Sequence, residues 1–493
     1  MINPDKMAQY IGKPKEEFTK KDLIKFIEGN NIEMINFRYV GGDGRLKTLN
    51  FAITSKTQLD QLLSSGERVD GSSLFSYIDT TSSDLYVTPR YKTAFINPFS
   101  SIPAVDILCS YYTEKGVRLA SSPENIIRKA HQVLKDNTGL TFEAMGELEY
   151  YVIYDNDPLY PASNQKGYQE SYPFIKWEKI RYEAMQAITQ AGGKIKYGHS
   201  EVGNLHNKEF SMEQHEIEFL PVPMEDAADC ITIARWMLRV IGYKYGVTIS
   251  FAPKVSLGHA GNGLHIHTRL TSSGKNMMID KNNLSDTARK AIAGYLTLSP
   301  SLTAFGNTVP TSYLRLVPGQ EAPTNICWGD RNRSVLVRVP LGWLNVKNMA
   351  KDANPLEKSK LKKYGSKQTI EFRCPDGSAN IYLLLAGLAV AARHGMEMKD
   401  ALKLANKLYI DTSSNKGNAS VKKMPRLPNS CWESAENLLK DRKIYEKNEV
   451  FPKNIIDGTA KELKDYEDKN LRKNLFVNKK ELQKLISKYL HCS

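Results

Sequence analysis

The feature that most constrains the fold is a series of strand-like segments in the second part of the chain, some of which follow one another without a helix between them. These segments cover residues 141–154, 194–202, 209–219, 247–252, 263–270, 333–339 and 368–373. Helical patterns cover residues 123–135, 176–191, 224–244, 283–297 and 379–406. Strands that adjoin in sequence favour an antiparallel sheet, because parallel neighbours need a long crossover. The pattern predicts an α+β fold with helices packed outside an antiparallel sheet.

The N-terminal part predicts a smaller α+β unit. A short helix is expected over residues 20–29, and strands over 33–40, 46–53, 84–88 and 104–112. The first two strands are joined by Gly41-Gly42-Asp43-Gly44, which is a strong hairpin signal. Turn residues from Gly116 to Ser122 precede the next helix. We therefore expect two domains, at residues 17–115 and 116–493.

Composition excludes several classes of protein. No run of eighteen apolar residues exists, so no membrane-spanning helix is expected. The polar stretch from Met1 to Lys15 argues against a secretory signal, and six cysteines without a CxxC pair favour a reduced, cytoplasmic protein. The formal net charge of +14 raises nucleic acid or an anionic membrane as partners. Because the C-terminal lysines alternate with acidic residues, we expect a solvated surface, no membrane association and no nucleic acid.

Carboxylates recur at a spacing of two on the predicted strands. Glu147 and Glu149 share one strand face, as do Glu216 and Glu218, and Glu201 lies on a further strand. Each of these could be a solvated strand carboxylate. Like charges held close together otherwise need a cation between them, so a metal site is the other interpretation.

Histidines and arginines accompany these carboxylates. His265 and His267 share a strand face directly after the glycine-rich turn at Gly261 to Gly263, which leaves hydrogen-bonded core histidines and ligand contacts equally open. Arg315, Arg333, Arg338 and Arg373 lie near or on apolar segments, and Glu371 shares a strand face with Arg373. A buried arginine is costly without an anionic partner, and arginine binds carboxylate or phosphate through paired hydrogen bonds. A surface salt bridge between Glu371 and Arg373 is the simpler alternative.

Taken together, these side chains suit one kind of chemistry. Oxygen ligands with one histidine suit Mg²⁺ or Mn²⁺, and several arginines suit phosphate. Phosphoryl transfer depends mainly on such positioning and charge neutralisation. The residues therefore predict a metal-dependent phosphoryl-transfer enzyme, without naming the acceptor.

The order of the motifs resembles that of type I glutamine synthetases, from Asp70 to Asn380. The matching segments are Asp70-Gly71-Ser72-Ser73 with Asp84, Arg315-Leu316-Val317-Pro318-Gly319 with Glu321-Ala322-Pro323, Arg331-Asn332-Arg333-Ser334, and Ile370-Glu371-Phe372-Arg373. The resemblance implies a small β-grasp domain followed by a catalytic domain with a curved antiparallel sheet. It also implies stacked hexameric rings, hence a dodecamer, with active sites between subunits.

The resemblance assigns a role to each candidate residue. Two divalent ions are implied, one held by Glu149, Glu201 and Glu216 and the other by Glu147, His265 and Glu371. ATP phosphates would contact His267, Arg333 and Arg338, and glutamate would contact Gly261, Arg315 and Arg373. Ammonium would be bound near Ser73 and Asp84 and deprotonated by Asp70, whose loop reaches a neighbouring subunit, while Glu321 lies on a flap over glutamate. The catalytic set is thus Asp70, Glu321, Arg333 and Arg373.

The reaction implied is ATP-dependent ligation of ammonium to L-glutamate through γ-glutamyl phosphate. Two alternatives are a γ-glutamyl ligase that uses another amine, and a non-catalytic relative or basic nucleic-acid-binding protein. Several positions depart from the family pattern, namely Ser200, Ala260, Gln320, Gln368 and Thr369. Tyr409 lies near a position that some members modify by adenylylation, although a packed tyrosine is the simpler interpretation.

Overall fold

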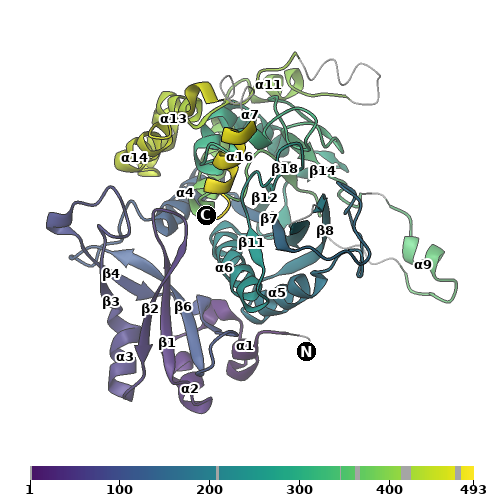
Figure 1. Cartoon of the computed structure of the whole chain (residues 1–493). Coiled ribbons are helices and arrows are strands. Elements are labelled where there is room, and N and C mark those ends of the chain that lie inside the picture. Colours follow the sequence, from purple (N-terminus) through teal and green to yellow (C-terminus); the bar gives the residue numbers. More distant parts are fainter. Residues whose placement is uncertain are drawn as a thin grey trace.

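We describe the fold from a computed structural model of the whole chain. The described residues are 3–206, 210–344, 346–360, 367–411, 423–471 and 479–492. Two sheets, each with its own helices, form the two main parts of the molecule (Figure 1).

The N-terminal sheet has the strand order β2-β1-β6-β4-β3, with β5 paired to β6. Its members are β1 (Met34–Val40), β2 (Leu46–Ala52), β3 (Glu67–Asp70), β4 (Asp84–Pro89), β5 (Phe95–Ile96) and β6 (Ala104–Tyr112). The predicted hairpin is confirmed, with β1 and β2 antiparallel and Gly44 in the left-handed region at φ 73°. Strand β1 pairs with β6 in parallel, so the sheet is mixed. This mixed sheet is the small α+β unit predicted for the N-terminal part.

Two helices cover this sheet. Helix α2 (Lys20–Gly29) begins at a capping box in which Thr19 and Asp22 exchange hydrogen bonds, and this fixes its start at the predicted residue. Helix α3 (Lys56–Ser65), which sequence analysis did not predict, buries Leu59, Leu62 and Leu63. These side chains join the apolar residues of β1 and β6 in a core of their own.

The larger sheet has the order β16-β17-β18-β12-β7-β9-β8. Its members are β7 (Thr141–Asp155), β8 (Ile195–His206), β9 (Phe210–Phe219), β12 (Leu264–Ser272), β16 (Trp328–Asp330), β17 (Val337–Val339) and β18 (Ile370–Phe372), with β10 (Val222–Pro223), β11 (Thr248–Ser250) and β13 (Lys275–Asn276) paired to β7 or β12. Every pair is antiparallel except β16 with β17, so the prediction of an antiparallel sheet is confirmed. The strand expected at 333–339 forms only from Val337.

Long helices pack beside this sheet. They are α4 (Pro123–Thr138), α5 (Glu178–Gln190), α6 (Met224–Lys244), α7 (Asp286–Gly306) and α10 (Ile381–Glu397), and they share one apolar core with the strands. The remaining elements are α1 (Lys6–Ile11), η1 (Lys15–Glu17), η2 (Thr80–Ser82), η3 (Tyr91–Thr93), β14 (Ile279–Asp280), β15 (Asn283–Leu284), α8 (Ser312–Arg315), α9 (Met349–Ala353), α11 (Ala401–Lys407), α13 (Cys431–Glu446), η4 (Lys447–Glu449), α14 (Lys453–Lys464), η5 (Asp468–Asn470) and α16 (Lys479–Lys488).

The single helix expected over 379–406 is wrong. The chain leaves α10 at Met398, which has extended dihedral angles, and α11 sets off at 108° to it. The turn allows Ala401 and Ala405 to pack against Ala293 of α7, a contact that a straight helix would not make. Within the described residues, no single helix is long and apolar enough to cross a membrane.

Candidate active site

An acidic cavity opens beside the central strands of the larger sheet. It is lined by Glu147, Glu149, Tyr168, Tyr197, His199, Glu201, Gln214, Glu216, Ala260, Gly261, His265, Arg315, Gln320, Glu321, Arg333 and Arg373. Strand register explains the gathering, because residues at a spacing of two share a face and antiparallel partners lie opposite each other. Glu147 pairs with both His265 and Glu218, and Glu149 pairs with Glu216.

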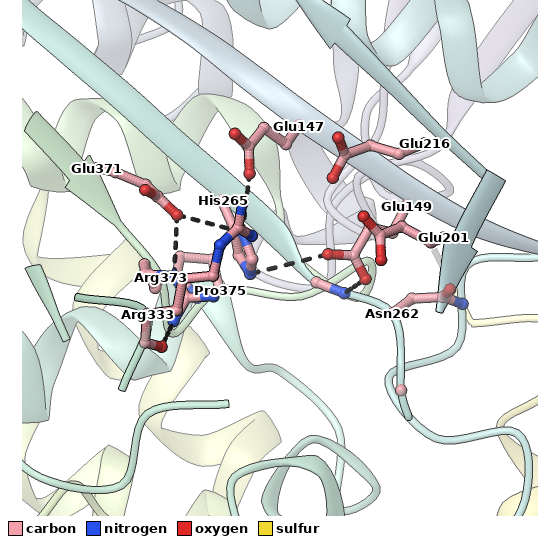
Figure 2. A network of polar contacts seen from close by, with 12 residues as sticks. Glu147, Glu149, Glu201, Glu216, Asn262, His265, Arg333, Glu371, Arg373 and Pro375 are labelled. Carbon is pink, nitrogen blue, oxygen red and sulfur yellow. Dashed lines mark hydrogen bonds and ion pairs between the residues drawn. The ribbon is translucent and has the colours of Figure 1, made fainter. Parts of the chain in front are cut away.

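The cavity has two sides, and His265 lies between them (Figure 2). Glu149, Glu201 and Glu216 gather on one side, which we call the acidic half. The other side, the histidine half, contains Glu147, His265, His267 and Glu371 together with Arg338 and Arg373.

In the acidic half, carboxylates face one another. Ligand atoms of His199, Glu201 and Glu216 all lie within 4.8 Å of one another, and His199 Nε2 is 3.2 Å from Glu216 Oε1. Burial, followed by the charge of Glu149, raises the pKa of Glu201 to about 8. Burial and the charges of Glu147 and Glu201 raise the pKa of Glu216 well above its ordinary value. These carboxylates therefore lack enough positive charge from the protein itself.

In the histidine half, the carboxylates are already neutralised. His265 Nδ1 lies 2.9 Å and His267 Nε2 lies 2.8 Å from oxygens of Glu147. Burial alone would raise the pKa of Glu147, but the two histidines outweigh it and bring that pKa well below the ordinary value. Ligand atoms of Glu147, His265 and Glu371 also lie within 4.8 Å of one another.

Glu371 is the centre of the histidine half. It is only 1% exposed, and it accepts from Arg338 Nη1 at 2.7 Å and from Arg373 Nε at 2.8 Å. Burial and Glu147 act to raise its pKa, but His267, Arg373 and His265 together lower it. The pair of Glu371 and Arg373 is therefore buried, and the alternative of a surface salt bridge is wrong.

The donor set fits a divalent cation. Carboxylate oxygens with a histidine nitrogen are the ligands that Mg²⁺ and Mn²⁺ prefer. The raised pKa values of Glu201 and Glu216 indicate that a cation bound beside them would stabilise their charged forms. Arg338 Nε is buried and has no hydrogen-bond partner among the described residues, so it is free to donate to a bound anion.

Comparisons with known proteins cover most of the chain. A family model described as "Glutamine synthetase, catalytic domain" matches residues 120–483, and one described as "Glutamine synthetase, beta-Grasp domain" matches residues 31–114. The chain belongs to the glutamine synthetase family. It is accordingly a ligase, and enzymes of this family use ATP and a divalent metal ion.

Individual members of the family are distant from this chain in sequence. The glutamine synthetase of Clostridium saccharobutylicum is 28% identical over 96% of this chain and 100% of its own length. That of Thermococcus kodakarensis is 30% identical over 83% of this chain and 84% of its own length. Among solved structures, Plasmodium falciparum glutamine synthetase matches with a TM-score of 0.74 at 20% identity, covering 92% of this chain and 97% of that one. A complex of GmaS with ADP matches with a TM-score of 0.72 at 17% identity and the same coverage.

The ammonium residues that family resemblance implies lie outside the acidic cavity. Asp70 and Asp84 oppose each other at the ends of β3 and β4, in the N-terminal sheet. The hydroxyls of Ser73 and Ser72 donate to Asp70 at 2.5 and 2.7 Å, and these hydrogen bonds hold the pKa of Asp70 well below its ordinary value. All of these side chains except Ser72, which is half-buried, are exposed. Within one chain, Asp70, Ser73 and Asp84 therefore do not line the acidic cavity.

Positions that depart from the family pattern have structural partners. The Ala260 N–H donates to Gln165 Oε1 at 2.8 Å, so a neighbouring loop contacts this backbone. Thr369 Oγ1 lies 3.0 Å from His267 Nδ1, and thereby orients that ring. Gln368 Nε2 donates to the Pro340 carbonyl at 2.9 Å. Tyr409 donates to Asp330 at 3.0 Å and is 37% exposed, so it is neither fully packed nor free.

Sequence analysis assigned no role to several residues that line the cavity. His199 lies two residues before Glu201, a spacing that could have identified it as a further ligand on the same face. Gln214, two residues before Glu216, donates to Glu149 at 2.9 Å and fixes that carboxylate. Tyr168 comes from a loop, and no periodicity in the sequence marks it.

Proposed function

We propose that this chain joins ammonia to the side-chain carboxylate of L-glutamate, converting ATP to ADP and phosphate and releasing L-glutamine. The observation that carries the proposal is the convergence of six distant side chains at one cavity. Five of them line it, namely Glu147, Glu149, Glu201, Glu216 and His265, and the sixth, Glu371, is buried with an oxygen 3.5 Å from His265 Nδ1. We also propose that the two domains divide at residues 115 and 116.

Two Mg²⁺ or Mn²⁺ ions would fit this set of donors. Glu149, Glu201 and Glu216 would hold one, and Glu147, His265 and Glu371 the other. When bound, such ions neutralise phosphate charge and orient the reacting groups. Gln214 and the Gly263 N–H, which donate to Glu149 at 2.9 and 2.7 Å, keep that carboxylate in place for its role.

The arginines would bind the anionic groups of the substrates. Arg333 and Arg338, with His267, would contact the phosphates of ATP. A glutamate side-chain oxygen attacks the terminal phosphorus, and the bond to ADP breaks, leaving γ-glutamyl phosphate. Arg373, whose Nη1 contacts the Arg333 carbonyl, is held where it would stabilise the transferred group. Arg315, which is 2% exposed, and Gly261 would hold the rest of glutamate.

Ammonia enters the second step. Asp70, with Ser73 and Asp84 beside it, would accept a proton from ammonium, and ammonia would displace phosphate from the acyl phosphate. Because these residues lie outside the cavity of their own chain, they would act in a neighbouring subunit of a ring. Glu321, which has φ 58°, lines the cavity and would help to exclude water from the intermediate.

A second candidate function is ligation of a different amine to glutamate. The amine subsite is the one part of the site that a single chain does not complete, so the cavity itself does not specify ammonia. The test is phosphate release from ATP with glutamate, comparing ammonium with methylamine, ethylamine and hydroxylamine, and mass measurement of the product. Turnover with ammonium well above that with alkylamines is expected. Preference for an alkylamine would establish the second function, and no turnover with any amine would refute both.

A further inference from the structure

A buried lysine lies just behind the acidic cavity. Lys254 is only 2% exposed, and its Nζ contacts the His259 carbonyl and Gln320 Oε1. Among the residues that the structure describes, no carboxylate forms an ion pair with it. Burial, and then the nearby Arg315, lower its pKa to about 8. Arg315 has Asp376 and Glu149 near it, whereas Lys254 has a positive neighbour and no ion-paired carboxylate among the described residues. A buried cation of this kind is costly, and an anion nearby would relieve that cost.

The lysine determines which way the amide of Gln320 faces. An ammonium group can only donate, so the atom of Gln320 that it contacts must be the carbonyl oxygen. The amide nitrogen of Gln320 must then point elsewhere, and it has no partner among the described residues. Gln320 lines the acidic cavity, whereas Lys254 does not. The positive charge of Lys254 therefore polarises the Gln320 amide, and the N–H groups of that amide are available as donors at the wall of the cavity.

Lys254 is joined to the loop that carries Gly261 on the wall of the cavity. Lys254 contacts His259, in the loop that leads to Gly261 and Asn262, and Asn262 lies on the far side of the cavity from Glu371 and Arg333 (Figure 2). The loop is closed tightly on itself, since a Cβ at Gly261 would meet the Pro253 carbonyl oxygen at 1.9 Å. Lys254 and Gly261 are thus held together, and Gln320 joins them from the flap.

We propose that Gln320, polarised by Lys254, binds the α-carboxylate of the amino-acid substrate and makes the site specific for an anion at that position. The inference rests on the proposed function, in which the side-chain carboxylate reacts at the opposite end. Donors backed by a cation favour a negatively charged oxygen over a neutral amide. Gln320 is thereby a specificity-determining residue in addition to Arg315.

The experiment uses the full-length protein and the substitution Gln320→Glu. Glutamate at this position still accepts from Lys254 but presents an oxygen in place of the N–H donors. We compare KM and kcat for L-glutamate with those for its α-amide, isoglutamine, and we measure binding of both by calorimetry with Mg²⁺ and ADP present. The KM for L-glutamate should rise at least about tenfold with kcat nearly unchanged, while the KM for isoglutamine should stay the same or fall.

Matched variants separate this role from a structural one. Gln186→Glu adds the same charge on an exposed helical residue and should change neither KM. Gln320→Leu removes the donors without adding charge and should raise the KM for L-glutamate with little effect on isoglutamine. Equal changes for both substrates, or no change in either, would overturn the inference. If no amine supports turnover, the proposed function fails, and the calorimetric preference of the wild type for L-glutamate over isoglutamine, lost in Gln320→Glu, still decides the inference.

Discussion

The two halves of the cavity use the same kind of side chain and are both largely buried, yet their electrostatics are opposite. In the acidic half, the pKa values of Glu201 and Glu216 are raised, because each faces other carboxylates. In the histidine half, the pKa values of Glu147 and Glu371 are lowered, because histidines and arginines outweigh burial. Burial alone therefore does not determine how a carboxylate behaves, and the sign of its neighbours does.

This difference separates two kinds of cation site. The acidic half requires charge from outside the chain, so it should take up a divalent ion readily. The histidine half is neutralised by its own side chains, and an ion bound there competes with Arg338 and Arg373 for Glu371. An anionic nucleotide that draws those arginines away would remove the competition. We therefore expect the ion in the histidine half to bind tightly only together with ATP.

The largest expected effect comes from removing the centre of the histidine half. Glu371→Ala removes a proposed metal ligand and leaves Arg338 and Arg373 without their common partner. Loss of such a group should lower ATP turnover by roughly a thousandfold or more, measured as phosphate release with glutamate and ammonium. The exposed Glu114→Ala is the control and should retain activity. Near-normal turnover in Glu371→Ala would remove Glu371 from the ligand set.

The next largest effect on turnover is expected from Asp70, a carboxylate that belongs to neither half of the cavity. Asp70→Ala should lower turnover with ammonium by about a hundredfold, as expected for loss of a proton acceptor. Hydroxylamine is already neutral near pH 7, so turnover with it should fall much less. Equal losses with both amines would contradict the proton-accepting role. Mixing Asp70→Ala with Glu371→Ala chains before assembly should restore some activity if the two residues act across a subunit boundary.

Stability measurements test the comparison of the two halves directly. In metal-free protein at pH 8, Glu371→Gln should lower the free energy of unfolding by about 3 kcal/mol, because the buried Arg373 and the half-buried Arg338 lose a charged partner. Glu216→Gln should raise it by about 1–2 kcal/mol, because it removes one of several buried like charges. Thermal or urea unfolding followed by circular dichroism measures both. Two changes of the same sign would show that the halves do not differ as described.

Much of this architecture could be predicted from periodicity and turn chemistry. The hairpin at Gly41 to Gly44, the start of α2 at Thr19 and the spacing of Glu147 with Glu149 are all local signals, and the structure contains each of them. The break after α10 was missed because the sequence around Met398 consists of good helix formers. The chain turns there to bring Ala401 and Ala405 against α7, which is a tertiary contact. Helix α3 was missed although Leu59, Leu62 and Leu63 carry a helical spacing, since its polar neighbours masked the pattern.

The composition of the site was more predictable than its electrostatics. Residue types and motif order predicted six carboxylate and histidine ligands, and strand register places Glu147 opposite His265 and Glu149 opposite Glu216. The shared strand face of Glu371 and Arg373 indicated a salt bridge between them, but not its burial. No sequence pattern shows that Arg338 also binds Glu371, or that Lys254 contacts Gln320, because these contacts join segments far apart in the chain. The difference between the two halves is a property of these long-range pairs, and it appears only in three dimensions.

The smallest expected effect is a pH dependence of stability that the acidic half should produce. The pKa of Glu201 is about 8 in the folded protein, against an ordinary value of 4.5. Between these values the folded chain keeps a proton that the unfolded chain releases, so metal-free stability should fall as pH rises from about 4.5 to about 8. Mg²⁺ or Mn²⁺ competes with that proton and should therefore raise the unfolding temperature more at pH 8 than at pH 6. Differential scanning fluorimetry with and without EDTA measures this, and Glu201→Gln should flatten the metal-free slope. A metal-induced shift of equal size at both pH values would mean that the cation does not bind where the protons do.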